Sequence, residues 1–322
     1  MSESACRICG NRQRIQSFSF PDYHLGLPDR FSYFQCGECG CLQKKDLKEE
    51  TSKFYPEDYY SFSYDYRTTV GSKIKWAIRD IRNEYYRTSR GKLGALIHQI
   101  LPCASVQMIA KVNPPKDWHI LDVGCGSDAL MLQYLASQGY EHLTGIDPYI
   151  SNDMIELGPI TIYKKELCDL SNGYDLITFN HSFEHIADQK KNLQHSRDLL
   201  KPSGKILMRI PTVSSYAWER YGELWPNLDA PRHLFLHSIR SLTLLAEQSG
   251  LTVEARYYDS TSFQFWGKKL YEKGLPLNSK KPMHRIIQAA FRLFYSLLYY
   301  KKVKQLNESS QGDTVALILK RK

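Results

Sequence analysis

Four cysteines near the start of the chain form two pairs, Cys6-x-x-Cys9 and Cys36-x-x-Cys39. A C-x-x-C turn holds two thiolates at the spacing of a tetrahedral zinc site, and two such turns supply four ligands. Such an ion would be structural, because a catalytic zinc keeps one coordination position open. The spacing therefore predicts a Zn²⁺ site in a small unit that spans residues 1–45.

Strand-like and turn-like stretches alternate between the two cysteine pairs, and the unit resembles a zinc ribbon. Thiols without a metal and a redox-active disulfide are the alternatives. The chain has eight cysteines but no visible export signal, so a disulfide scaffold is not expected. Zinc ribbons often bind nucleic acid, so the unit leaves RNA open as a partner, although it contains few adjacent basic residues.

A glycine turn of the form G-x-G-x-x-A begins at Gly124, and Asp122 stands two residues before it. Such a turn lets a ligand approach the backbone, and the following helix offers free N–H groups. The motif often binds a pyrophosphate, which the carboxylate of Asp122 would repel. Asp147, 21 residues after Gly126, closes the next strand-like stretch, where a carboxylate can accept ribose hydroxyl protons. These residues favour S-adenosylmethionine, a cationic nucleoside without phosphate, over a nicotinamide dinucleotide.

Two histidines and a glutamate are candidates for proton transfer. If S-adenosylmethionine donates its methyl group, positioning does much of the work, but a hydroxyl, amine or acidic carbon acceptor can need a base with a pKa near 7. His185 and His233 are the candidates for this base, and Glu184 would orient one of them or replace it. Residues 181–185 also match the H-x-x-E-H pattern of zinc peptidases, but that chemistry needs both histidines on one helix.

These residues need elements that bring them together. Strand-like and helix-like stretches alternate from residue 118 onward, which predicts a parallel sheet with helices on both faces. We expect strands at 118–124, 142–147, 159–165, 174–180, 205–211, 251–259 and 313–322, and helices at 128–139, 188–200 and 238–250.

The sequence DVGCG at 122–126, followed by GIDP at 145–148, resembles the first two motifs of class I S-adenosylmethionine-dependent methyltransferases. Residues 174–188 and 199–211 resemble the fourth-strand and fifth-strand motifs of that family. The resemblance covers about 116–260 together with the terminal strand. It implies an α/β fold with a Rossmann-like, seven-stranded sheet, an antiparallel last strand and helices on both faces.

The resemblance also implies roles for individual residues. Gly124, Cys125 and Gly126 would line the methionine part of the cofactor, with Asp122 beneath it and Asp147 at the ribose.

The ends of the third and fourth strands complete this implied site. Asn180 and His181 would face the methyl group of the cofactor. The adenine contact stays open among Glu166, Leu167 and Asp169.

Residues 223–238 resemble a segment of bacterial methyltransferases from clusters that modify surface polysaccharides and sugars. This resemblance implies a small-molecule or glycan acceptor, such as a sugar or sugar nucleotide. Arg232 could hold a phosphate or carboxylate of that acceptor, or it could pair with Asp229 instead.

Three parts of the chain are expected: the cysteine unit 1–45, a connector with helices 46–115, and a methyltransferase domain 116–322 with a helical insertion at about 262–312. Helical patterns between 72 and 112 break near Gly91, Gly94 and Pro102.

The net charge of +9 permits several partners. An RNA-modifying methyltransferase is the alternative to the glycan enzyme, and a scaffolding protein without activity is less favoured because the cofactor residues are intact. The stretch 262–302 could cover a substrate, contact a membrane surface through residues 286–302, or simply pack. No signal peptide or transmembrane segment is visible, so we expect a cytoplasmic protein.

Overall fold

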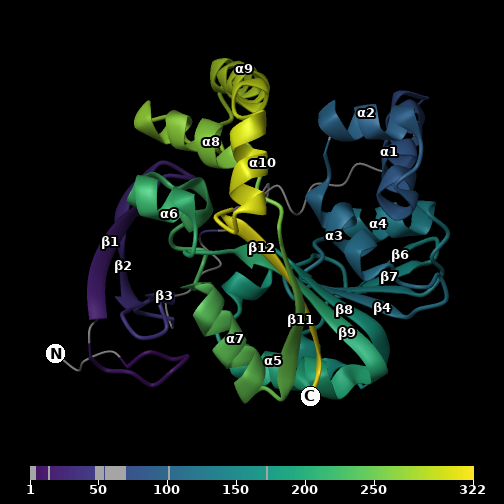
Figure 1. Ribbon diagram of the computed structural model, residues 1–322, viewed down its shortest axis with the longest axis horizontal. Helices are drawn as coiled ribbons and strands as arrows, with labels where there is room; N and C mark the ends of the chain where they lie inside the picture. Colours follow the sequence, from purple (N-terminus) through teal and green to yellow (C-terminus); the bar gives the residue numbers. More distant parts are fainter. Residues whose placement is uncertain (1–4, 14, 48–53, 55–69, 101, 172) are drawn as a thin grey trace.

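The computed structural model describes residues 5–13, 15–47, 54, 70–100, 102–171 and 173–322, which fold around an eight-stranded and a four-stranded sheet (Figure 1). The large sheet has the order β11-β12-β9-β8-β4-β5-β7-β6. Its strands are β4 (Ile120–Val123), β5 (Leu143–Ile146), β6 (Met154–Leu157), β7 (Ile160–Tyr163), β8 (Tyr174–Asn180), β9 (Leu200–Pro211), β11 (Leu251–Tyr258) and β12 (Thr314–Arg321).

Seven of these strands are the expected ones, and β12 runs antiparallel to both β9 and β11 as predicted. The additional strand is β6, which forms a hairpin with β7 through Gly158 and Pro159. β6 has little signal in the sequence, because it has only four residues and two of them are exposed. β9 also begins five residues earlier than predicted, directly after the preceding helix.

Side chains alternate between the two faces of the large sheet, and each face is covered by helices. Ile120, Leu176 and Leu207 share a core with α3 (Ala104–Val112) and α4 (Leu130–Ser137). Their neighbours in the strands, including Leu121 and Ile177, share the opposite core with α5 (Gln189–Leu199) and α7 (Ile239–Gln248). The expected helices on both faces are therefore present.

The four-stranded sheet combines the start of the chain with a strand from much later in it. β1 (Ile15–Asp22), β2 (Leu27–Cys36) and β3 (Leu42–Lys44) are antiparallel neighbours, and β3 also pairs with β10 (Phe235–Leu236). A third core lies under this sheet and contains Phe20, Phe31, Tyr33, Trp225 and Leu236. The division expected at residue 45 is thus bridged by a shared sheet and a shared core.

Two helical groups lie at the upper end of the molecule in Figure 1. One contains α1 (Val70–Thr88) and α2 (Lys92–Ile100), and Trp76 of α1 packs on Tyr134 of α4 with ring centroids 5.0 Å apart. The break predicted at Gly94 was wrong, because this residue lies inside α2.

The other group lies in the segment 262–312, where a helical insertion was predicted, and consists of α8 (Phe263–Glu272), α9 (Pro282–Leu298) and α10 (Tyr300–Glu308). A short helix, α6 (Tyr216–Tyr221), lies between β9 and the segment that leads to β10. Of the predicted part 46–115, residues 48–53, 55–69 and 101 lie outside the described residues. Among the helices that the structure describes, none combines the length and apolarity required to cross a membrane.

Candidate functional site

The predicted cofactor residues gather where the strand order of the large sheet reverses. From β4 the chain moves outward to β5 and β7, and then returns to β8 and β9 on the other side of β4. Open α/β sheets bind ligands at this point, beyond the carboxyl ends of the strands. Because the predicted residues follow the ends of β4, β5 and β8 directly, the fold brings them to one edge.

The glycine turn after β4 needs glycine for space as well as for backbone conformation. Gly124 has φ +74°, and a Cβ atom there would lie 2.5 Å from Cβ of Ser182. The side chain of Cys125 turns toward Gly145, where an added Cβ would lie 2.6 Å from Sγ of Cys125. Cys125 can therefore offer its backbone to a ligand, while its thiol fills the space that Gly145 leaves.

Asp147 holds this turn from the end of β5. Its Oδ2 accepts a hydrogen bond of 3.1 Å from the backbone N–H of Gly126, and its Oδ1 accepts one of 2.9 Å from the N–H of Tyr149. The residue is only 8% exposed, and burial raises its pKa. Each carboxylate oxygen can accept a second donor, as ribose recognition requires.

Asp122 lies in the sheet directly beneath the turn. The register of β4 and β8 places it opposite Thr178, whose hydroxyl donates a hydrogen bond of 2.7 Å to its Oδ1. Asp122 is 3% exposed, and this burial raises its pKa to about 7. Its negative charge at neutral pH is therefore only partial without a ligand, and a neighbouring cation would favour the ionised form.

The end of β8 has a strained backbone at His181, which has φ +56°. Its N–H bonds to the carbonyl of Arg209 (2.8 Å), and Arg209 also donates to Oδ1 of Asn180 (3.3 Å). The following turn, Phe183–His185, is a 3₁₀ helix, so the two histidines of the H-x-x-E-H pattern do not share an α-helix. This geometry differs from the single helix that the peptidase chemistry needs.

The three residues predicted for proton transfer come together although His233 is distant in sequence. One potential ligand atom from each of Glu184, His185 and His233 lies within 4.8 Å of the others. Nδ1 of His185 is 3.0 Å from the carbonyl of Arg232, and Nδ1 of His233 is 2.8 Å from that of Asn227. Because a carbonyl can only accept, each Nδ1 carries the proton, and Nε2 holds the lone pair in the neutral ring.

Burial sets the charge states of this group. It lowers the pKa of His233 to about 4, with help from His185, so His233 is neutral at pH 7. Burial also favours the neutral acid of Glu184, but the hydrogen bond from His181 and the nearby imidazoles outweigh it and lower that pKa to about 2. Oε2 of Glu184 is buried, and no described protein group donates to it. One carboxylate and two imidazoles can accept a proton, and they are also a ligand set for a divalent cation.

The loop that carries His233 is held by the four-stranded sheet. Arg232 is fully buried, and its Nη1 and Nη2 donate to the two carboxylate oxygens of Asp22 at the end of β1, at 2.9 and 2.8 Å. Its Nε and Nη2 also donate to Asp229. The hydroxyl of Tyr33 in β2 donates to the carbonyl of His233 at 2.8 Å.

These contacts decide between the two roles that the sequence left open for Arg232. The guanidinium pairs with protein carboxylates and has no exposed surface, so it is a structural residue and not a contact for an anionic acceptor. Asp22 and Tyr33 were missed, because they lie 210 and 200 residues from their partners and have no local motif.

The adenine alternatives also differ in position. Leu167 is buried in the core, whereas Glu166 and Asp169 are exposed at the turn that follows β7.

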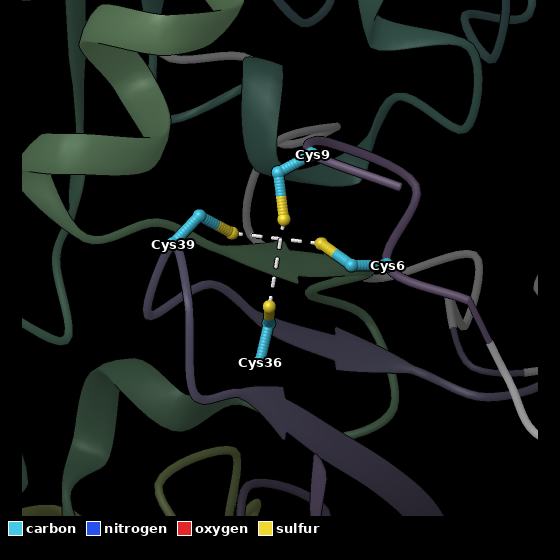
Figure 2. Close-up of side chains that lie close together, drawn as sticks. All are labelled: Cys6, Cys9, Cys36 and Cys39. Atoms are coloured by element: carbon cyan, nitrogen blue, oxygen red, sulfur yellow. Dashed lines mark hydrogen bonds between the residues drawn. The ribbon is translucent and has the colours of Figure 1, made fainter. Parts of the chain in front are cut away.

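The four predicted cysteines form one cluster (Figure 2). Their Sγ atoms point to a common centre, with 3.5 Å between Cys6 and Cys39 and 3.6 Å between Cys9 and Cys36. A tetrahedral zinc with bonds of about 2.3 Å places its sulfurs about 3.8 Å apart, close to these separations.

The surroundings of the cluster suit thiolates. Gly10 and Gly40, which follow the two C-x-x-C pairs, both have φ +75° and close tight turns onto Cys6 and Cys36. The amide of Gln43 donates to Sγ of Cys6 at 3.0 Å, and the N–H of Glu38 donates to Sγ of Cys36 at 3.4 Å. The four sulfur ligands and the N–H groups that donate to them therefore fit a structural metal ion.

Comparison with known proteins places the domain in a family. A family model described as a methyltransferase domain matches residues 86–256, more than half of the chain. The chain belongs to this methyltransferase-domain family. The match includes the glycine turn, Asp147 and the group of Glu184, His185 and His233, but it excludes the cysteine cluster.

Two curated relatives of this methyltransferase domain bear the name ubiquinone biosynthesis O-methyltransferase. The protein from Histophilus somni is 27% identical over 137 residues, which are 38% of this chain and 57% of that protein. The protein from Azorhizobium caulinodans is 29% identical over 118 residues, which are 33% of this chain and 46% of that protein. The chain thus spans about half the length of the curated relatives it matches.

Among solved structures, the cyclopropane synthase MmaA2 from Mycobacterium tuberculosis has a TM-score of 0.45 at 14% identity, covering 75% of this chain and 97% of that one.

Proposed function

We propose that the protein transfers a methyl group from S-adenosylmethionine to an acceptor. One observation carries the choice of cofactor: a buried carboxyl with a pKa of about 7, Asp122, lies beneath the glycine turn at the reversal point of the sheet. A pyrophosphate there would keep this carboxyl protonated or be repelled by it, whereas a cationic ligand would be attracted to its ionised form. Membership of the methyltransferase-domain family supports the same choice.

The residues present fit this cofactor. The backbone of residues 124–126 would hold its methionine part, Asp147 its ribose hydroxyls, and Asn180 and His181 would lie on the side of the methyl group. When bound, the cofactor supplies an electrophilic methyl group on a sulfonium. The chain would orient the acceptor for an in-line approach and exclude water from the site.

Proton transfer falls to the group at residues 184, 185 and 233. In neutral His233, the unprotonated Nε2 atom lies 3.8 Å from Oε1 of Glu184. The carboxylate of Glu184 would stabilise the imidazolium that forms when this ring accepts a proton. His185 is the more accessible of the two rings, so it is our first candidate for the base that contacts the acceptor. His233 would then serve as its neighbour, with ring centroids 4.8 Å apart.

The acceptor that we propose is a sugar, a sugar nucleotide or a surface polysaccharide. The segment 223–238, whose resemblance suggests this class, provides His233 and forms part of the wall of the site. Since Arg232 is engaged with Asp22 and Asp229, it does not supply the phosphate contact of a sugar nucleotide. The names of the two curated relatives favour an oxygen nucleophile and make a ubiquinone-related compound the alternative acceptor.

A structural zinc is the second part of the proposal. Cys6, Cys9, Cys36 and Cys39 would bind it and join the start of the chain to the end of β2. All eight cysteines of the chain are unpaired, which agrees with a reducing, cytoplasmic environment.

Calorimetry tests the cofactor first, with S-adenosylhomocysteine and NAD as the two titrants. We expect heat of binding from S-adenosylhomocysteine and none from NAD. Asp147→Asn should weaken the affinity for S-adenosylhomocysteine at least tenfold. Asp153 is an exposed acid close in sequence, and Asp153→Asn should leave that affinity unchanged. Heat from NAD alone would overturn the proposal. Methyl-donor consumption with sugars, nucleotide sugars, ubiquinone precursors and RNA would then identify the acceptor, and retention of RNA in electrophoresis at two salt concentrations would favour the RNA alternative.

A further inference from the structure

Helix α9 packs through only one of its sides. Tyr295 and Tyr299 stack in parallel with centroids 5.6 Å apart, and Tyr299 continues the stack onto Phe265 of α8 at 4.1 Å. On the same side, the hydroxyl groups of Ser296 and Ser262 are 2.7 Å apart. Yet no residue of this 17-residue helix is fully buried within the described structure.

The opposite side of α9 is apolar and open. Met283, Ile286, Leu293 and Leu297 recur at three-, seven- and four-residue spacings, so they lie along one stripe of the helix. Their exposed fractions are 64%, 63%, 66% and 75%, and the adjacent Phe294 is 59% exposed. Large apolar side chains that are exposed together in this way mark an interaction surface.

The charge around this stripe has one sign. Residues 273–307 contain eight Lys or Arg residues and no Asp or Glu, whereas the whole chain has a net charge of +9. Nearly all of the excess charge is therefore concentrated in this segment. Arg285 and Arg292 are exposed on α9 itself, and Lys301 and Lys304 are exposed on α10.

We propose that α9 docks the protein onto an anionic lipid bilayer, with the helix parallel to the membrane plane. An apolar stripe within a segment whose charged side chains are all cations suits the interface of such a bilayer, since acyl chains take up the stripe and anionic headgroups neutralise cations elsewhere on α9 and on α10. In Figure 1, α2 reaches the same upper end of the molecule, where Leu93 and Leu96 are 57% and 53% exposed and could add to the contact.

The other occupants fit less well. A second copy docked through the same stripe would bring two segments of like charge together, which is unfavourable. A nucleic acid would neutralise the cations but leave the apolar stripe without a partner. A lipid surface satisfies both features.

Co-sedimentation with vesicles tests this proposal. The full-length protein should bind vesicles of mixed phosphatidylglycerol and phosphatidylcholine, and bind those of phosphatidylcholine alone at least tenfold more weakly. Binding should also weaken between about 0.05 M and about 0.5 M salt, because salt screens the charges. Equal binding to both kinds of vesicle, or none to either, would overturn the proposal.

Three pairs of substitutions separate the contribution of the cations from that of the apolar stripe. Arg285→Glu with Arg292→Glu should lower the partition coefficient at least about tenfold. The control, Lys190→Glu with Lys191→Glu, makes the same charge change at exposed sites of α5, on the opposite side of the molecule. This control should alter the partition coefficient less than about twofold. Leu293→Asp with Leu297→Asp should abolish binding without changing the melting temperature or the affinity for S-adenosylhomocysteine.

Self-association is measured in parallel by light scattering. A wild-type dimer that the Leu293→Asp, Leu297→Asp variant converts to a monomer, with vesicle binding unaffected, would assign the stripe to a second copy and refute the lipid proposal. Since lipid binding and cofactor binding are measured separately, failure of this proposal leaves the proposed methyl transfer untouched.

Discussion

The contact between Asp22 and Arg232 should support both stability and catalysis. Replacing Asp22 with Asn removes the charge and leaves an amide whose N–H groups face the guanidinium. Breaking a buried ion pair from one side costs about 3–5 kcal/mol. Because Asp229 still pairs with Arg232, we expect a smaller loss, about 2–3 kcal/mol, and a melting temperature lowered by about 3–5 °C.

The Asp22→Asn substitution should also lower kcat, independently of its effect on stability. The carbonyl of Arg232 holds Nδ1 of His185, and His233 is the next residue, so a displaced Arg232 misplaces both imidazoles. A loss of about 1.4 kcal/mol in transition-state stabilisation is a tenfold loss in kcat. We expect the Asp22→Asn variant to lose at least tenfold in kcat at temperatures where it is folded. Its affinity for S-adenosylhomocysteine should stay the same, because the glycine turn and Asp147 belong to other strands.

A matched control is available at the surface. Arg30 of β2 and Glu223 form an ion pair of 3.3 Å between the same two parts of the chain, but their side chains are 51% and 44% exposed. Glu223→Gln should cost no more than about 1 kcal/mol and leave kcat unchanged. The reasoning fails if Asp22→Asn melts like the wild type, or if it weakens cofactor binding in proportion to kcat.

Three other predictions concern charge and metal. Burial raises the pKa of Asp122 from 3.8 to about 7, so between these values the folded protein binds more protons than the unfolded chain and loses stability as pH rises. Asp122→Asn should therefore raise the melting temperature more at pH 8 than at pH 5 while it weakens S-adenosylmethionine binding in calorimetry; an equal shift at both pH values would contradict this. Because the pKa of His233 is about 4, kcat should not titrate through this ring between pH 5.5 and pH 8, and a step near pH 6.5 that His233→Asn removes would show the opposite. Native mass spectrometry should find one zinc per chain, lost with chelator or Cys36→Ser together with thermal stability, whereas two zinc ions would indicate a metal at Glu184, His185 and His233.

The cofactor edge could be predicted from the sequence because its information is local. Gly124 and Asp147 each follow a short apolar strand directly, so the alternation of strands and helices already places them at one edge. The cysteine pairs are equally local, since each knuckle contains its own two ligands and its own glycine. In both cases the fold had only to bring together units that the sequence defines within about ten residues.

What the sequence could not provide depends on pairing across long distances. β10 has two residues and exists because it pairs with β3, almost two hundred residues earlier. The role of Arg232 depends on Asp22 in the same way. Asp122 shows a third limit, because its residue type was evident but its pKa follows from burial and from Thr178 on the neighbouring strand.

The cysteine cluster and the predicted base are connected through β2. Cys36 is the last residue of this strand, and Tyr33, three residues earlier, donates to the carbonyl of His233. A metal that fixes the end of β2 would therefore also fix the loop of His233, although it lies outside the site and supplies no chemistry. A ribbon that served only to bind nucleic acid would not have this effect. Loss of zinc and loss of the Asp22 carboxylate should consequently produce the same phenotype, in which turnover declines while S-adenosylhomocysteine still binds.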